Sequence, residues 1–276
     1  MTWGSWGKQL SKSEMIDLMN HCVEQGVTTF DHADIYGEYE NETAFGTAFA
    51  ASGIQRDTIQ LISKCGIQMT SGRDNRVKHY QYDADYIVWS AEQSLRKLQS
   101  DYLDLFLLHR PSPLMVPEEV AKAVDKLKQD EKIRAFGVSN FTPSQVALIE
   151  SAVAIEGNQV EYSLTHCLPM EDGTFDDCIS NSRMAMAWSP LGSYFRSTGA
   201  QYERISTVLP PLCEKYDADE SQLLLAFIFK HPAVVHPVVG TTNKERLTAS
   251  MKATDIDLEL QDWFTLLEAS KGEPVP

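Results

Sequence analysis

The sequence predicts an α/β fold of the TIM, or (β/α)8, barrel type. Short apolar runs alternate with amphipathic segments of helical period along the whole chain, a pattern typical of parallel strands joined by crossover helices. Runs such as Leu103–Leu108 are almost wholly apolar, as expected of strands covered on both faces. A closed barrel is favoured over an open dinucleotide-binding sheet because no Gly-x-Gly-x-x-Gly loop occurs in the chain. The length of 276 residues suits a single barrel domain over residues 1–276.

Helical periodicity gives the expected helices. They span Glu14–Gln25, Glu42–Ala51, Ala84–Leu98, Pro117–Lys128, Pro143–Val153, Phe175–Ser182, Glu220–Lys230, Lys244–Lys252 and Leu258–Leu267. Ser13 and Asp83 stand where caps of the first and third helices are expected, and Pro117 and Pro143 open the fourth and fifth.

Seven apolar runs predict the strands. They are Thr28–Phe30, Thr58–Ile62, Leu103–Leu108, Ala135–Val138, Gly157–Val160, Met184–Trp188 and Val234–Val239. The eighth strand of the barrel would have to come first, but only Met1–Trp3 precede Gly4, and the first predicted helix follows soon after. We therefore expect a barrel whose first strand is a stub or has been lost with an N-terminal piece of the fold.

Two connections between these elements are long, Cys65–Asp83 and Pro190–Tyr202. Loops of such length in a compact domain are usually functional or disordered. The stretch Gln68–Gln81 is rich in charged and aromatic side chains. That composition fits a cap over a substrate site or a solvated surface loop, and we favour the surface loop.

Composition excludes several classes of function. The formal charge of -15 argues against nucleic acid or an anionic membrane surface as a partner. Five cysteines without zinc-type spacing suit a reducing compartment. No apolar stretch is long enough to span a membrane, and the N-terminus does not resemble a signal peptide. We expect a cytoplasmic protein, either a monomer or a small homo-oligomer.

Polar and titratable residues follow the predicted strands directly, and the C-terminal ends of barrel strands are where TIM-barrel active sites lie. Taken singly, each position also fits an ordinary role: a strand-end lysine at the surface, a buried core histidine, or a helix cap. Their placement at one predicted rim is what indicates a site. The residues in question are Asp31, Asp34, Tyr36, Lys64, His109, Ser139, Asn140, Gln159, Trp188, Ser189 and Thr241.

These residues belong to a series of motifs that resembles the aldo-keto reductases. The motifs are Phe30-Asp31-x-Ala33-Asp34-x-Tyr36-Gly37, Ser63-Lys64, Asp101 to Leu105 with His109-Arg110-Pro111, Gly137 to Phe141, Asn158 to Glu161, Trp188 to Gly192 and Gly240 to Asn243. They come in the family's order and cover most of the chain. Within the family the sequence is most similar to bacterial oxidoreductases related to the potassium-channel β subunits.

The resemblance implies NADPH-dependent reduction of an aldehyde or ketone to an alcohol. It assigns Tyr36 as the general acid, Lys64 as the cation that lowers the pKa of Tyr36, Asp31 as the partner of Lys64, and His109 as the group that orients the carbonyl oxygen. Hydride would come from the cofactor, because no side chain can supply it.

The resemblance also assigns the cofactor contacts. Ser139, Asn140 and Gln159 would hydrogen-bond the nicotinamide carboxamide, and Trp188 would stack on its ring. Ser189, Pro190 and Leu191 would hold the pyrophosphate. Gly240, Thr241, Thr242, Lys244 and Arg246 would form the site of the adenosine 2′-phosphate, which favours NADPH over NADH. The sequence departs from the family in two places. The family's N-terminal β-hairpin and most of its first strand are missing, and in the predicted helix Lys244–Lys252, Ala249-Ser250 replace the acid-Asn pair that usually meets adenine.

Two other functions remain open at this point. A non-enzymatic module that binds NADPH and senses redox state would need the same nucleotide residues without the acid, but all four catalytic positions are intact. A metal-dependent hydrolase or isomerase would use His32, Asp34 and His109 as ligands, although no His-x-His pair supports it.

Overall fold

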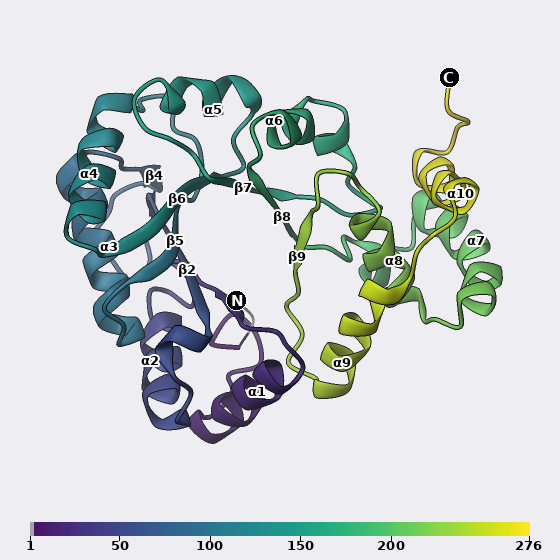
Figure 1. Cartoon of the computed structure of the whole chain (residues 1–276), viewed down its shortest axis with the longest axis horizontal. Helices are drawn as coiled ribbons and strands as arrows, with labels where there is room; N and C mark the ends of the chain where they lie inside the picture. Colours follow the sequence, from purple (N-terminus) through teal and green to yellow (C-terminus); the bar gives the residue numbers. More distant parts are fainter. Residues whose placement is uncertain (1–2) are drawn as a thin grey trace. The chain divides into compact units, whose positions relative to one another are not determined.

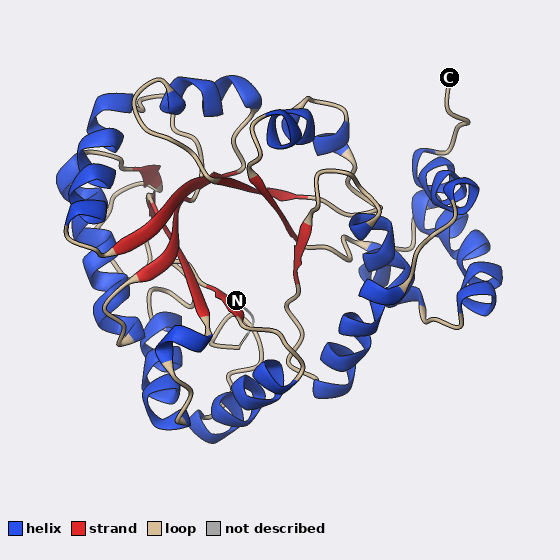
Figure 2. Ribbon diagram, viewed as in Figure 1, coloured by secondary structure: helices blue, strands red, loops and turns tan. Residues whose placement is uncertain are grey.

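The computed structural model describes residues 3–276. They form two compact units, one that ends at Asn158 and one from Gln159 to Pro276. In each unit parallel strands alternate with helices (Figure 2). Of the expected remnant of strand 1, residues 1 and 2 lie outside the described part, and Trp3 is buried in a bend, with its ring centroid 6.1 Å from that of Phe30. No strand precedes the first helix within residues 3–276.

The first unit contains most of the strands. Its elements are α1 (Lys12–Glu24), β1 (Thr29–Asp31), α2 (Asn41–Ser52), β2 (Gln60–Cys65), β3 (Ile67–Gln68), β4 (His79–Tyr80), α3 (Ala84–Leu98), β5 (Leu103–Leu108), α4 (Pro117–Gln129), β6 (Ile133–Ser139) and α5 (Pro143–Glu150). The large sheet has the order β1-β2-β5-β6, with every neighbour parallel. Helices α2, α3 and α4 follow one another along the outer face of β2, β5 and β6 (Figure 1).

The register of β1 against β2 decides which side chains face the helices. Asp31 pairs with Ile62, and side chains alternate between the two faces of a strand. Lys64 therefore shares the face of Ile62 and Asp31, whereas Ser63 lies on the opposite face, where it contacts Glu42 of α2. Catalytic candidates and helix-facing polar residues thus occupy opposite faces of the same two strands.

Helices α3 and α4 begin where the local sequence predicted, but the N-terminal cap of α1 is a different residue from the one expected. Ser11, not Ser13, caps α1, and its side chain forms a capping box with Glu14. Asp83 caps α3 as predicted, through a 3.0 Å hydrogen bond from the backbone amide of Tyr86. Pro117 occupies the first turn of α4, where a missing amide hydrogen costs nothing.

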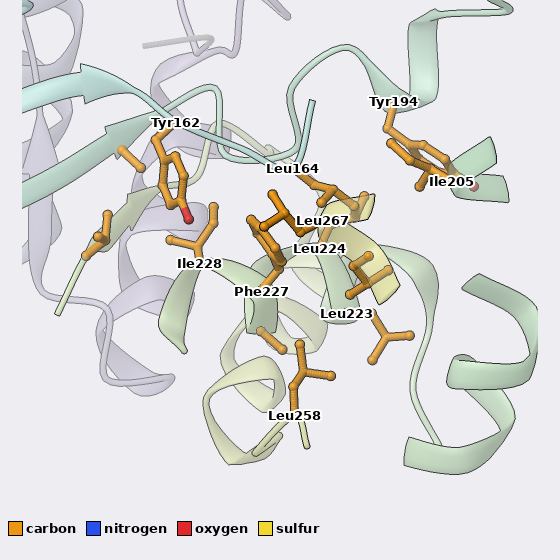
Figure 3. Packing of buried hydrophobic residues seen from close by; sticks show 14 of the residues in the cluster. Tyr162, Leu164, Tyr194, Ile205, Leu223, Leu224, Phe227, Ile228, Leu258 and Leu267 are labelled. Atoms are coloured by element: carbon orange, nitrogen blue, oxygen red, sulfur yellow. The ribbon is translucent and has the colours of Figure 1, made fainter. Parts of the chain in front are cut away.

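The second unit carries β7 (Gly157–Glu161), which contains the boundary between the units, and the following elements. They are α6 (Thr174–Ser180), β8 (Met184–Trp188), α7 (Ala200–Tyr216), α8 (Glu220–Phe229), β9 (His236–Val238), α9 (Lys244–Lys252) and α10 (Leu260–Lys271). Strands β8 and β9 are parallel. Helix α8 is buried around most of its circumference and, with Tyr162, Ile205 and Leu267, forms the core of this unit (Figure 3).

Helix α7 was not predicted, and the expected loop Pro190–Tyr202 ends inside it. Pro210 and Pro211 lie within the helix, and proline removes a backbone donor and normally ends a helix. Burial of Ile205, Leu209 and Leu212 against the core of the second unit compensates for this local penalty. Packing, which the local sequence does not show, decides the structure here.

The connection Cys65–Asp83 is also more ordered than a plain loop. Strands β3 and β4 pair antiparallel within it, with Ile67 opposite Tyr80. The guanidinium of Arg73 lies 4.2 Å from the ring centroid of Tyr39, and its Nη1 donates a 2.6 Å hydrogen bond to Gln68. Residues 76–80 are exposed, as expected of a surface loop, but the base of this segment is packed against the first unit.

Candidate active site

Lys64 and Asp31 form a buried ion pair at the ends of β2 and β1. The ammonium of Lys64 donates 2.7 Å hydrogen bonds to both carboxylate oxygens of Asp31 and to the carbonyl oxygen of His32. The Lys64 side chain is fully buried and that of Asp31 is 12% exposed. Burial alone would lower the pKa of Lys64, but Asp31 and Tyr36 outweigh it and hold this pKa above its ordinary value. Lys64 is therefore a permanent cation.

Tyr36 lies on the same side as Lys64, whose Nζ is 5.4 Å from the centroid of its ring. Burial raises the pKa of Tyr36. Lys64 lowers this pKa through its charge and its hydrogen bond, but this does not cancel the effect of burial. Lys64 thus acts in the expected direction, but the pKa of Tyr36 is above its ordinary value, not below it. The correction has a simple cause, because the loss of water around the phenolate exceeds the stabilisation by one ammonium.

The turn that carries Tyr36 is held by tight contacts with the N-terminal segment. A Cβ atom at Gly37, where φ is +60°, would lie 2.0 Å from Oδ1 of Asn41, and one at Gly4 would lie 1.8 Å from the same atom. The ring of Trp6, which is half exposed, lies 6.2 Å from the ring of Tyr36. Residues 3–10 therefore help to form the surroundings of the phenol.

His109, the fourth residue predicted to act in catalysis, directly follows β5. Its ring meets the Tyr36 ring edge to face, with 5.9 Å between centroids, and its backbone amide donates to Cys65 O at 2.8 Å. Burial lowers the pKa of His109 well below its usual value, with further lowering by Lys64 and Arg110. The imidazole is therefore neutral at neutral pH and can donate one N–H. Its Nδ1 is buried without a hydrogen-bond partner.

Beside the predicted catalytic residues, a cluster of buried polar groups lies on the helix-facing side of these strands. Ser63 donates a 2.6 Å hydrogen bond to Glu42, and Asp34 accepts 3.3 Å hydrogen bonds from Tyr86 and Ser90. Burial and the neighbouring Glu42 raise the pKa of Asp34 to about 7. Asp34 stands in the same motif as Asp31 and Tyr36, but only the fold brings it next to Tyr86 and Ser90 of α3.

His32 belongs to the same side. Its ring centroid is 4.3 Å from that of Phe45, and both ring nitrogens are buried without hydrogen-bond partners. Within residues 3–276 no three His, Cys, Asp or Glu side chains gather in a way that could hold a metal ion. The metal-dependent alternative built on His32, Asp34 and His109 therefore has no ligand set.

Ser139 and Asn140, the cofactor candidates of the first unit, end β6. Asn140 takes the left-handed conformation, with φ of 63°. Its amide donates to Ser139 Oγ at 2.8 Å and to the carbonyl oxygen of His109 at 3.3 Å. The two residues are thus connected to the backbone of His109 after β5, and they do not serve only as a helix cap. The cap of α5 is Thr142, which forms a capping box with Gln145.

The second unit holds the other cofactor candidates, at the ends of its own strands. Gln159 is buried in β7, with its amide 3.9 Å from the sulfur of Met186, and Trp188 is half buried at the end of β8. Ser189 then takes a φ of 52°, and its carbonyl oxygen accepts a 2.7 Å hydrogen bond from Gly192. Pro190 is buried and Leu191 half buried in this turn.

The predicted phosphate site is the start of α9. Gly240, Thr241, Thr242 and Asn243 precede this helix, and the Asn243 side chain caps it by accepting a 2.8 Å hydrogen bond from the Arg246 amide. Lys244 is half buried and Arg246 exposed in the first turn. Further along, the carbonyl of Ala249 accepts a hydrogen bond from Gln222. A helix start with two cations suits a phosphate.

The sequence is similar to known proteins over nearly its whole length. The sequence profile of the aldo/keto reductase family matches residues 1–271. Oxidoreductase YdhF of Escherichia coli is 38% identical over 99% of this chain and 93% of its own length. Oxidoreductase YcsN of Bacillus subtilis is 39% identical over 96% and 91%, and a 6-dehydroglucose reductase of Agrobacterium fabrum is 38% identical over 92% and 86%.

A solved structure supports the fold. The crystal structure of the thermostable aldo-keto reductase Tm1743 with the inhibitor epalrestat superposes with a TM-score of 0.79 at 27% identity, covering 97% of this chain and 93% of that one. This match confirms the predicted α/β TIM-barrel fold class. No helix within residues 3–276 is long and apolar enough to cross a membrane. The chain belongs to the aldo-keto reductase family and is an oxidoreductase of that family.

Proposed function

We propose that this protein reduces an aldehyde or ketone to an alcohol with NADPH, and that Tyr36 is the general acid. The observation that carries the proposal is the buried Asp31–Lys64 pair beside Tyr36 and His109, all within one unit. Such a fixed cation beside a protonated phenol is suited to stabilise negative charge as it develops on oxygen.

The residues fit this cofactor. The start of α9 with Arg246 suits a 2′-phosphate, and Asn140 and Ser139 place amide and hydroxyl groups beside the backbone of His109. When bound, NADPH supplies a hydride to the carbonyl carbon. The neutral imidazole of His109 donates an N–H to the carbonyl oxygen and orients it.

The proton comes from Tyr36. Its raised pKa keeps the phenol protonated at neutral pH, and the alkoxide formed by hydride addition is a stronger base than a phenolate. The Tyr36 O–H bond breaks as the alcohol O–H bond forms, and Lys64 stabilises the phenolate that remains until it takes a proton from water. Asp31 keeps Lys64 in place and charged.

The test is NADPH oxidation by the purified protein with 4-nitrobenzaldehyde. Tyr36→Phe should lower kcat by about 10²–10⁴-fold, the range expected for loss of a general acid, and leave NADPH binding unchanged. Tyr39→Phe is the matched control, because the Tyr39 hydroxyl binds the backbone amide of Met69 rather than Lys64. Equal activity of Tyr36→Phe and the wild type would contradict the assignment of the acid.

The finer placement near the potassium-channel β subunits rests on the motifs alone, and it leads to the second candidate, a regulatory module that binds NADPH. Wild-type protein that binds NADPH stoichiometrically but turns over no carbonyl would favour that module. Because some relatives are named 6-dehydroglucose reductases, 6-dehydroglucose belongs in the carbonyl panel beside 4-nitrobenzaldehyde and a diketone.

A further inference from the structure

The segment between β2 and α3 ends in a tyrosine that reaches the catalytic end of β5. Tyr82 is 7% exposed, and its hydroxyl donates a 2.5 Å hydrogen bond to the carbonyl oxygen of Arg110 and accepts one of 3.2 Å from the Arg110 amide. A single phenol therefore binds both backbone groups of the residue that follows His109.

The backbone of His109 is held from two other strands. Its amide donates to Cys65 at the end of β2, and its carbonyl oxygen accepts from Asn140 after β6. With Tyr82, each of the four peptide N–H and C=O groups of His109 and Arg110 has a partner. These hydrogen bonds hold the backbone of the two residues in position.

The ring of Tyr82 packs directly against the backbone of Gly66. A Cβ atom at Gly66 would lie 2.0 Å from Cε1 and 2.3 Å from the hydroxyl oxygen of Tyr82, and Gly66 has a φ of +114°. Only glycine allows both the close approach of the ring and this backbone conformation. The carbonyl of Gly66 also accepts a 2.9 Å hydrogen bond from the amide of Gln81, which brings the end of the segment back to β2.

The His109 ring is buried and packs against Tyr36, but one of its nitrogens has no hydrogen-bond partner. Its Nδ1 is buried without a partner, so no second side chain fixes the ring through that nitrogen. The edge-to-face contact with Tyr36 does not by itself fix how far the imidazole lies from a bound carbonyl. That distance depends on the position of the His109 backbone. In catalysis a misplacement of about 1 Å can cost a large part of the rate.

We propose that Tyr82 is a positioning residue for His109: through the backbone of Arg110 it sets where the imidazole meets the carbonyl oxygen. The inference rests on the proposed function for the role of His109. In this proposal the packed part of the connection between β2 and α3, which carries Tyr82, acts on His109, whereas the exposed residues 76–80 form a surface loop.

Tyr82→Phe keeps the ring on Gly66 and removes only the hydroxyl. It should lower kcat/KM for 4-nitrobenzaldehyde about tenfold, as expected for hydrogen bonds of ordinary strength, and leave NADPH affinity nearly unchanged. Tyr86→Phe is the matched control, because Tyr86 lies in the adjoining helix and its hydroxyl contacts Asp34 instead. It should not change kcat/KM.

A double-mutant cycle with His109→Gln separates positioning from general stabilisation. If Tyr82 acts through His109, Tyr82→Phe should change kcat/KM less than about twofold in the His109→Gln background. An equal loss in both backgrounds, or no loss in the single variant, would overturn the proposal.

A readout that needs no turnover keeps this test apart from that of the proposed function. In Tyr82→Phe the Arg110 amide should exchange its hydrogen faster and the imidazole NMR signals of His109 should shift, with neither change in Tyr86→Phe. Unshifted His109 signals in Tyr82→Phe would refute the positioning role, whereas absence of carbonyl turnover in the wild type would refute only the proposed function.

Discussion

Lys64 in the first unit and Arg246 in the second are the two cations that we propose act in catalysis and in phosphate binding, and their surroundings are opposite. Lys64 is fully buried in the first unit, where three 2.7 Å hydrogen bonds fix its ammonium. Arg246 is exposed in the first turn of α9 in the second unit. The buried cation is preorganised, because its desolvation was compensated when the protein folded. The exposed cation keeps its side-chain entropy and its water until a ligand binds, so its effect should appear as affinity.

The largest effect should come from Lys64→Met. This substitution leaves the mostly buried carboxylate of Asp31 without its cation, which typically costs about 3–5 kcal/mol of stability, and it removes the charge that stabilises the Tyr36 phenolate. We expect urea unfolding to show that loss and kcat to fall at least as far as in Tyr36→Phe.

The control for this prediction is Lys132→Met. Lys132 forms a 2.6 Å ion pair with Glu92 on a partly exposed surface, where pairs contribute about 0–1 kcal/mol. A loss of stability in Lys64→Met no larger than in Lys132→Met would show that the contrast between the buried and exposed cations is wrong.

Arg246→Ala should have an intermediate effect that is confined to binding. Loss of a charge-assisted contact with phosphate corresponds to about 1.5–3 kcal/mol, or roughly 10–100-fold in KM for NADPH. The kcat at saturation and the KM for NADH should stay unchanged, and the effect should shrink as salt is added. Glu245→Ala, the exposed neighbour, serves as control. An equal rise in KM for NADH would rule out the 2′-phosphate assignment.

The smallest effect concerns Asp34, whose burial in the first unit is less well compensated than that of Lys64. Its pKa of about 7 in the folded protein lies above the ordinary value of 3.8, so the folded state binds the proton more tightly than the unfolded state. Stability contributed by this group is present below about pH 4 and is lost as the pH rises towards 7.

Asp34→Asn removes this dependence. Part of the raised pKa comes from repulsion by Glu42, which can adjust its own protonation, so we expect the variant to gain roughly 2 kcal/mol relative to the wild type between pH 4 and pH 7. Urea unfolding at several pH values measures the difference. A difference that is constant over this range would contradict the raised pKa of Asp34.

The local sequence predicted helices and strands well where the period of the apolar residues and the residues at the ends of the element indicated the same bounds. The bounds of β5, β8, α3 and α9 match the structure residue for residue, because each has a clear apolar pattern and recognisable end residues. Helix α7 was missed because Pro210 and Pro211 contradict the local pattern and only tertiary packing supports the helix. The hairpin of β3 and β4 was missed because its strands have two residues each.

The sequence by itself determined the chemistry available: a phenol, an ammonium, a carboxylate and an imidazole, each directly at or after a strand, in the order of one family. Only the tertiary structure decided how they behave. The pKa of Tyr36 rises rather than falls because burial outweighs Lys64, and the position of His109 depends on Tyr82 and Gly66, which no motif contains. Burial and long-range contacts depend on many residues that lie far apart in the sequence. They therefore cannot be predicted from any local stretch of it.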